Sequence, residues 1–134
     1  ESCTIAGNLA YDAGAGLYLV GLGPDEVWNT IVYHNAGADV WLGGSAADRI
    51  GYSCLPETLA GAGNLTDDPQ FIAPEQGDYR LKRTSPCVDA GTNRAWMAVG
   101  ARDLDGAWRL DLQSRQVDIG CYEYAVRATI LLIR

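Results

Sequence analysis

Two short stretches of this sequence, CTIAGN at residues 3–8 and TIVYHN at residues 30–35, align at an offset of 27 residues, and each ends in asparagine. A second pair, GAGLYL at residues 14–19 and GADVWL at residues 37–42, aligns at an offset of 23 residues. A third, degenerate copy begins with IGYSC at residues 50–54. Short β-type runs that recur with a period of about 20 to 30 residues and have glycine-rich corners are typical of solenoids.

Each of these apolar runs is too short to bury its own hydrophobic face, so neighbouring copies have to cover one another. The two offsets place Ile5 over Val32 and Leu19 over Leu42. Stacked copies of this kind pair their strands in parallel and align like residues in an interior column. The repeats therefore predict an all-β fold, a parallel β-helix or solenoid of which this chain holds the last two to three coils.

The same offsets bring two further pairs of side chains together. Asn8 over Asn35 would form a ladder of side-chain amides at a corner of the coil, which is a structural use of asparagine. Because successive strand residues face opposite sides, Trp41 should point away from the core, and Tyr18 should stack beside it. Tyr18 and Trp41 would then form an exposed aromatic strip, a surface on which sugar rings stack.

Composition excludes two classes of partner. The chain has 134 residues, with 10 Lys and Arg against 17 Asp and Glu, and a net charge of −7. No stretch approaches the roughly 18 apolar residues of a membrane span, and the negative charge argues against binding nucleic acid through its phosphates. The 16 glycines indicate a chain that turns often. We therefore expect one domain with no membrane span and no nucleic-acid partner.

The repeats end near residue 65, and four ordered motifs follow: DPQFIAPEQGDYRL (68–81), SPCVDAG (85–91), DLDGAWR (103–109) and VDIGCYEY (117–124). In order and spacing this series resembles the closing segment of bacterial surface proteins termed choice-of-anchor Q domain proteins. The resemblance implies a right-handed parallel β-helix of a secreted or cell-surface protein, for which an activity is usually unassigned.

The motifs also divide the chain. We expect parallel β-helix coils over residues 1–65, a C-terminal capping segment over 66–124, and a terminal strand or tail over 125–134. An open solenoid ends in unpaired backbone groups and an apolar cross-section, and the capping segment would cover that end. The other end, at Glu1, would stay uncapped, which predicts possible self-association through the N-terminal end.

Charged residues of the capping segment are expected to be paired rather than catalytic. Asp103 and Asp105 can accept backbone N–H groups in a tight turn around Gly106, and Arg109 can bridge to a carboxylate such as Asp118. Asp103 and Asp105 also resemble the start of a calcium loop, although the later ligands of that pattern are missing. Calcium is therefore an open alternative, and no other cofactor is expected.

The four cysteines, Cys3, Cys54, Cys87 and Cys121, include no closely spaced pair, which argues against zinc. Two possibilities stay open: buried free thiols, or a bridge between Cys87 and Cys121, which lie in the same terminal block. A bridge would fit an exported protein.

These observations favour a structural, non-catalytic role for this part of an exported surface protein. The alternative is a β-helix that binds carbohydrate, through Tyr18 and Trp41, or degrades polysaccharide with active coils upstream. Candidate acids for a two-carboxylate glycosidase lie near the corners of the coils: Asp25, Glu26, Asp39 and Asp48. The single histidine, His34, precedes Asn35 at a corner and is expected to be a solvated turn residue. A lyase is poorly supplied, because Arg49 is the only base before residue 79.

Overall fold

The computed structural model describes residues 1–20, 26–44, 49–97, 100–110 and 115–125. The described residues form short strands and two 3-10 turns, joined by irregular segments. In chain order these are β1 (Thr4–Ile5), β2 (Leu17–Leu19), β3 (Val27–Trp28), β4 (Ile31–Val32), β5 (Val40–Leu42), β6 (Ile50–Gly51), β7 (Phe71–Ala73), η2 (Pro74–Gln76), β8 (Asp78–Leu81) and η3 (Ala95–Met97).

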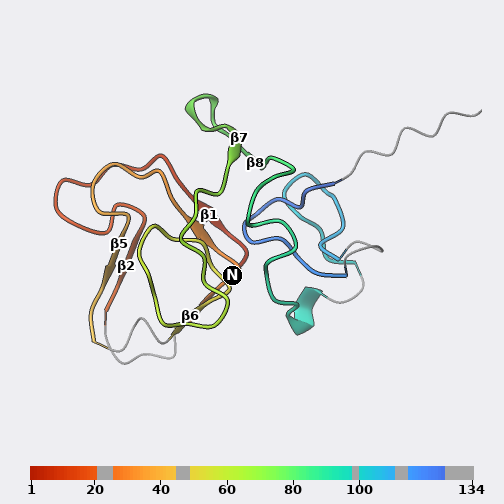
Figure 1. The fold of residues 1–134 in the computed structure, drawn as a ribbon, viewed down its shortest axis with the longest axis horizontal. Helices are drawn as coiled ribbons and strands as arrows, with labels where there is room; N and C mark the ends of the chain where they lie inside the picture. The colour runs from red at the N-terminus through yellow and green to blue at the C-terminus, as the bar shows by residue number, and fades with distance from the viewer. Residues whose placement is uncertain (21–25, 45–48, 98–99, 111–114, 126–134) are drawn as a thin grey trace, which may run out of the picture.

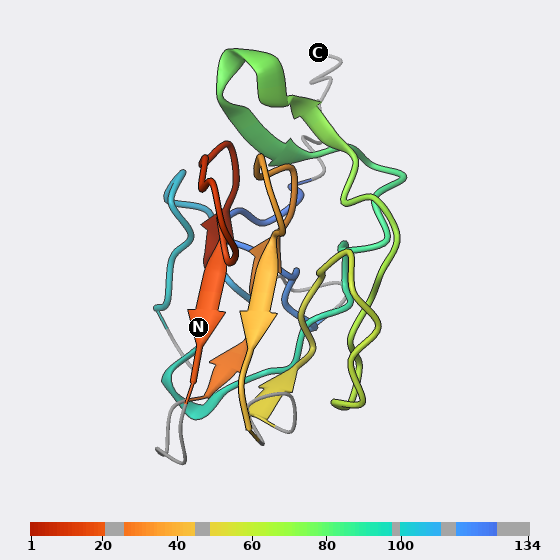
Figure 2. The same ribbon diagram turned by 90° about the vertical axis from the view of Figure 1, so that its left-hand side faces the viewer.

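Copies of the repeat pair in parallel with the predicted register. Strand β1 pairs with β4, β2 with β5, and β3 with β6. Ile5 lies opposite Val32 and Leu19 lies opposite Leu42, so both stacked pairs predicted from the repeat offsets are confirmed. Figure 2 shows β2 and β5 running side by side in the same direction.

The prediction of an all-β, right-handed parallel β-helix is nevertheless wrong. The described strands are two to four residues long and form separate two-stranded sheets, one of them antiparallel, and they do not close into a solenoid. Most of the described residues lie in turns and irregular backbone.

The backbone conformation explains why the strands are so short. Asn29 and Tyr52 have φ angles of 52° and 47°, and they directly follow β3 and β6. A left-handed residue cannot continue a strand, so each of these strands ends after two residues. The copies also shorten along the chain, because Ile31 pairs with Thr4, Cys54 with Ile31, and Leu65 with Cys54.

Strand β4 separates two buried clusters. Val32 packs with Val40, Ile50 and Leu55 between the stacked copies. Its neighbour Ile31 faces the opposite way, as successive strand residues do, and joins a second cluster. That cluster consists of Ile31, Cys54, Phe71, Leu81, Cys87 and Ile119. The C-terminal segment therefore supplies the second layer that buries the outer face of β4.

The described residues of the segment from 66 to 124 lie beside the stacked strands, as Figure 1 shows. Its backbone bonds directly to the first two copies: the Gly120 N–H donates to the Asn29 carbonyl over 2.8 Å, and the Cys121 N–H donates to the Thr4 hydroxyl over 3.2 Å. The sequence predicted a cover over the last coil. The observed contacts instead lie along the side of the stacked strands. Ile31 packs there against the C-terminal segment, and the Asn29 carbonyl accepts the Gly120 N–H. Of the tail expected over 125–134, residues 126–134 lie outside the described residues.

Strands β7 and β8 form an antiparallel hairpin that projects from one end of the molecule in Figures 1 and 2. Phe71 and Leu81 pair at its base and anchor it in the second cluster. Gly77, with a φ of 77°, closes the turn after η2. None of the helices in the described ranges is long and apolar enough to cross a membrane.

Candidate functional site

Tyr18 and Trp41 form an exposed aromatic pair on the β2–β5 sheet. Their ring centroids lie 4.6 Å apart and their planes differ by 8°. The two side chains are 57% and 39% exposed, because Leu17, Leu19 and Val40 occupy the positions that face inward. The predicted geometry, stacked rings pointing away from the core, is confirmed.

A second aromatic pair is covered. Trp28 and Tyr52 stack with centroids 5.9 Å apart, and the Arg94 guanidinium lies 4.8 Å from the Trp28 ring. Arg94 also forms an ion pair with Glu1 at 3.0 Å, which fixes it above the ring. Sequence reasoning missed this arrangement, because no periodic signal links Arg94 to the repeats. Of the two aromatic pairs, only Tyr18 and Trp41 lack such a cover among the described contacts.

The predicted asparagine ladder is present at a corner. The Asn8 side-chain amide donates to Asn35 Oδ1 over 3.0 Å, and Asn35 Nδ2 donates to the Ile5 carbonyl over 3.0 Å. Asn35 is 9% exposed and also donates to Asp39 Oδ1 over 2.6 Å. Asp39, one of the candidate glycosidase acids, is therefore part of the structural corner.

The other candidate acids do not form a group with it in the described residues. Glu26 accepts a hydrogen bond from Trp28 Nε1 over 3.0 Å and lies on the covered aromatic stack. Asp25 and Asp48 lie outside the described residues.

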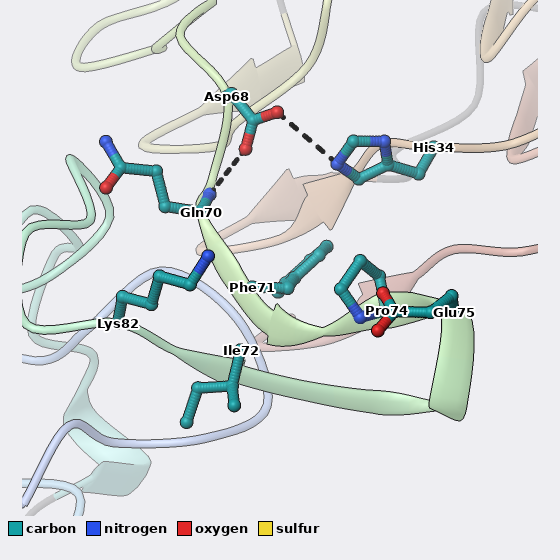
Figure 3. A pocket seen from close by; sticks show the side chains of 8 residues that line it. All are labelled: His34, Asp68, Gln70, Phe71, Ile72, Pro74, Glu75 and Lys82. Atoms are coloured by element: carbon teal, nitrogen blue, oxygen red, sulfur yellow. Dashed lines mark hydrogen bonds and ion pairs between the residues drawn. The ribbon is translucent and has the colours of Figure 1, made fainter.

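His34 borders a pocket of about 380 Å³ at the base of the hairpin (Figure 3). Its lining residues are His34, Asp68, Gln70, Phe71, Ile72, Pro74, Glu75 and Lys82. His34 Nε2 lies 3.5 Å from Asp68 Oδ2, and the side chains are 39% and 56% exposed. The sequence predicted His34 as a solvated turn residue, and its φ of 60° agrees with a turn. No repeat or motif predicted that Asp68 would lie beside it.

Arg109 forms the most buried ion pair of the described residues. Its Nη1 donates to Glu123 Oε1 and to the Gly120 carbonyl, each over 2.9 Å, and the two charged side chains are 4% and 9% exposed. Arg109 Nη2 also lies 3.4 Å from the carbonyl oxygen of Ser2. Arg109 thus bridges to a carboxylate as predicted, but that carboxylate belongs to Glu123 and not to Asp118, the residue suggested from the sequence. Asp118 instead accepts the backbone N–H groups of Asp89 and Tyr124, which leaves Glu123 to pair with the guanidinium.

Asp103 makes the turn that the sequence predicted. Its Oδ1 accepts the N–H groups of Asp105 and Ala107 over 2.9 and 2.7 Å, and its Oδ2 accepts the N–H of Glu123 over 2.8 Å. Asp105 accepts hydrogen bonds from Arg80 Nε and Nη2 over 2.6 and 2.7 Å. Both carboxylates of the suggested calcium site are therefore engaged by protein donors. Within the described ranges, no group of three or more His, Cys, Asp or Glu is placed to hold a metal ion.

Burial changes the ionisation of two carboxyls around Arg109. Burial, together with the charge of Asp118, raises the pKa of Glu123 to about 8 despite the ion pair. Burial likewise raises the pKa of Asp118 to about 6, against the hydrogen bonds from Asp89 and Tyr124. The buried Glu123 carboxyl lies near a second buried acid, Asp118, so Glu123 is favoured in its protonated form near neutral pH.

All four cysteines are free thiols. The bridge suggested between Cys87 and Cys121 is not formed. Cys87 is fully buried in the cluster that contains Ile31, whereas the backbone of Cys121 bonds to Thr4. The thiol that neighbours Cys87 is that of Cys54, from the repeat region.

The structure thus brings together Tyr18 with Trp41, and Arg109 with Glu123, at two separate places. The first is an open surface, and the second is a buried seam between the repeats and the C-terminal segment. Self-association through the N-terminal end stays a prediction. No family model, curated protein or solved structure matches this chain.

Proposed function

We propose that this chain is a structural, non-catalytic C-terminal part of an exported bacterial surface protein, in which residues 66–124 brace the stacked strands of residues 1–65. The observation that carries the proposal is the buried Arg109 side chain, which bonds to Glu123 and Gly120 and reaches the Ser2 carbonyl. One side chain thereby ties the last motif to the first residues of the repeats.

The other charged residues of the motifs support the same role. Asp103 and Asp118 are 8% and 2% exposed, and each accepts backbone N–H groups from its own segment. A carboxylate that is buried and saturated by backbone donors is poorly placed to exchange protons with a substrate. The exported, bacterial part of the proposal rests on the resemblance of the four ordered motifs.

A turnover assay tests the non-catalytic part. The chain is incubated with neutral and uronate-containing polysaccharides, and newly formed reducing ends are measured. We expect no release above the buffer control. Release that disappears in the His34→Ala variant, with an unchanged circular dichroism spectrum, would contradict the proposal and place an acid–base site in the pocket beside Asp68.

A second candidate function, carbohydrate binding, is favoured by the exposed pair Tyr18 and Trp41. Parallel aromatic rings that remain 57% and 39% exposed offer apolar surface to the C–H faces of a sugar. Glycan-array binding should then be lost in Trp41→Ala and in Tyr18→Ala. Tyr11→Ala is the matched control, because Tyr11 is 95% exposed and lies outside the pair. Absence of binding by the parent chain, or binding that survives in Trp41→Ala, would rule this function out.

A further inference from the structure

Two cysteines from different parts of the chain meet in the core. Cys54 lies in the repeat region, where its backbone pairs in parallel with Ile31 on one side and with Leu65 on the other. Cys87 lies in the C-terminal segment, where its carbonyl accepts the N–H of Ile119 over 2.9 Å. Both residues are 0% exposed and belong to the same buried cluster.

The two thiols are neighbours within that cluster. Both side chains belong to one six-residue buried cluster, and the side chain of Cys87 contributes to the raised pKa of the Cys54 thiol. The Cys54 thiol donates to the Asp67 carbonyl over 3.2 Å, and the Ser85 hydroxyl, two residues before Cys87, donates to the nearby Pro69 carbonyl over 2.6 Å. The other two cysteines are placed differently. Cys3 is exposed and its thiol donates to the Glu1 carbonyl, while Cys121 is only partly buried. Of the four thiols, the described contacts bring only these two together.

We propose that Cys54 and Cys87 are a disulfide-forming pair, which cross-links the repeat region to the C-terminal segment when the chain folds in the presence of a low-molecular-weight disulfide such as oxidised glutathione. One cysteine thiolate attacks a glutathione sulfur and forms a mixed disulfide, releasing the first reduced glutathione. The second thiolate then attacks the protein sulfur, forms the Cys54–Cys87 bond and releases the second. Oxidised glutathione takes up the two electrons, and the two thiol protons end on the reduced glutathione molecules.

Burial decides when this reaction occurs. The hydrogen bond with Cys87, and then burial, raises the pKa of the Cys54 thiol, so the reactive thiolate is scarce in the folded chain. The pair should therefore oxidise during folding, before the cluster with Ile31 closes, and slowly or not at all once the reduced chain is folded. The finished bond would be shielded from reductants by the same burial.

The experiment refolds the chain from denaturant in a buffer of reduced and oxidised glutathione. Thiols are then counted in denaturant, and unreduced peptides are analysed by mass spectrometry. We expect two thiols to remain and one linked peptide pair, containing Cys54 and Cys87, to appear. The cross-link closes the loop from residue 54 to residue 87 in the unfolded chain, so the thermal midpoint should rise by roughly 10 °C relative to the reduced chain.

The Cys3→Ser/Cys121→Ser double variant isolates the pair, because it keeps only Cys54 and Cys87. It should lose both thiols on oxidative refolding and show the same rise in midpoint, without forming intermolecular disulfides. Four thiols that stay free in the parent chain would overturn the proposal, as would a link between Cys87 and Cys121. Formation of only intermolecular links in the double variant would overturn it as well.

Discussion

The guanidinium of Arg109 lies 2.9 Å from the carboxylate of Glu123, and the two side chains are 4% and 9% exposed. The same guanidinium reaches the carbonyl of Ser2, so the ion pair sits where the last motif meets the first residues of the repeats. A buried ion pair contributes little net stability, but removing one partner leaves an uncompensated charge. A single substitution at Arg109 or Glu123 should therefore affect the stability of both the repeats and the C-terminal segment.

The stability of the protein should fall as the pH rises. The folded-state pKa values of Glu123 and Asp118, about 8 and about 6, lie above the ordinary values of these groups. Between about pH 4 and pH 8 the folded chain therefore holds more protons than the unfolded chain, so the stability present at low pH is lost as the pH approaches 8. Glu123 alone should account for a loss on the order of 4 kcal/mol. Urea unfolding at a series of pH values measures this directly.

Replacing Glu123 tests the assignment of that pH dependence. Glu123→Gln keeps a neutral, hydrogen-bonding side chain beside Arg109, so its unfolding free energy should change much less between pH 6 and pH 8. Glu75→Gln is the control, because Glu75 is an exposed residue of the hairpin. A Glu123→Gln variant with the same pH slope as the parent chain would show that another group is responsible.

Asn35 should contribute more to the unfolding free energy than its partner Asn8. Asn35 is 9% exposed and bonds to Asn8, Ile5 and Asp39. Asn35→Ala leaves these groups without partners and should lower the unfolding free energy by about 1 to 3 kcal/mol. Asn8→Ala is the matched variant. Asn8 is exposed, so this substitution should lower the unfolding free energy by less. Equal losses for the two variants in denaturant titrations would contradict the ladder as a buried corner.

Gly51 leaves space for the Trp28 ring. A Cβ atom at Gly51 would lie 2.6 Å from the Cζ3 atom of Trp28, so the ring would have to move. Gly51→Ala should therefore cost about 1 to 3 kcal/mol. The same change in a Trp28→Ala background should cost much less, because the ring is gone. Additive losses in this double-mutant cycle would show that the two residues are not in contact.

The parallel pairing could be predicted from the sequence because like residues recur at fixed offsets, as Ile5 and Val32 do. That the strands do not close into a β-helix could not be predicted. Left-handed residues such as Asn29 end the strands, and an asparagine in the sequence does not reveal whether it adopts this conformation. The partner of Arg109 also could not be predicted from the sequence. Asp118 and Glu123 lie in one motif, and only the fold decides that backbone donors take the first and the guanidinium takes the second.

The most direct test of the bracing role is hydrogen exchange in the Arg109→Met variant. In the parent chain the amides of Ile31 and Tyr33 donate to carbonyls of Cys3 and Ile5 over 2.9 and 3.2 Å, within the stacked strands. At pH 8.5, where Glu123 is ionised in the parent chain, the variant should lose about 3 to 5 kcal/mol of stability, because the buried Glu123 carboxylate loses its partner. Arg80→Met, which removes an exposed arginine, is the control and should change little.

If residues 66–124 brace the repeats, the amides of Ile31 and Tyr33 should lose protection in Arg109→Met together with those of residues 117–121, by roughly 100-fold or more. The milder Glu123→Gln variant, studied at pH 8.5 if the first variant does not fold, should show the same joint loss on a smaller scale. Faster exchange confined to residues 66–124, with the amides of Ile31 and Tyr33 as protected as in the parent chain, would contradict the account.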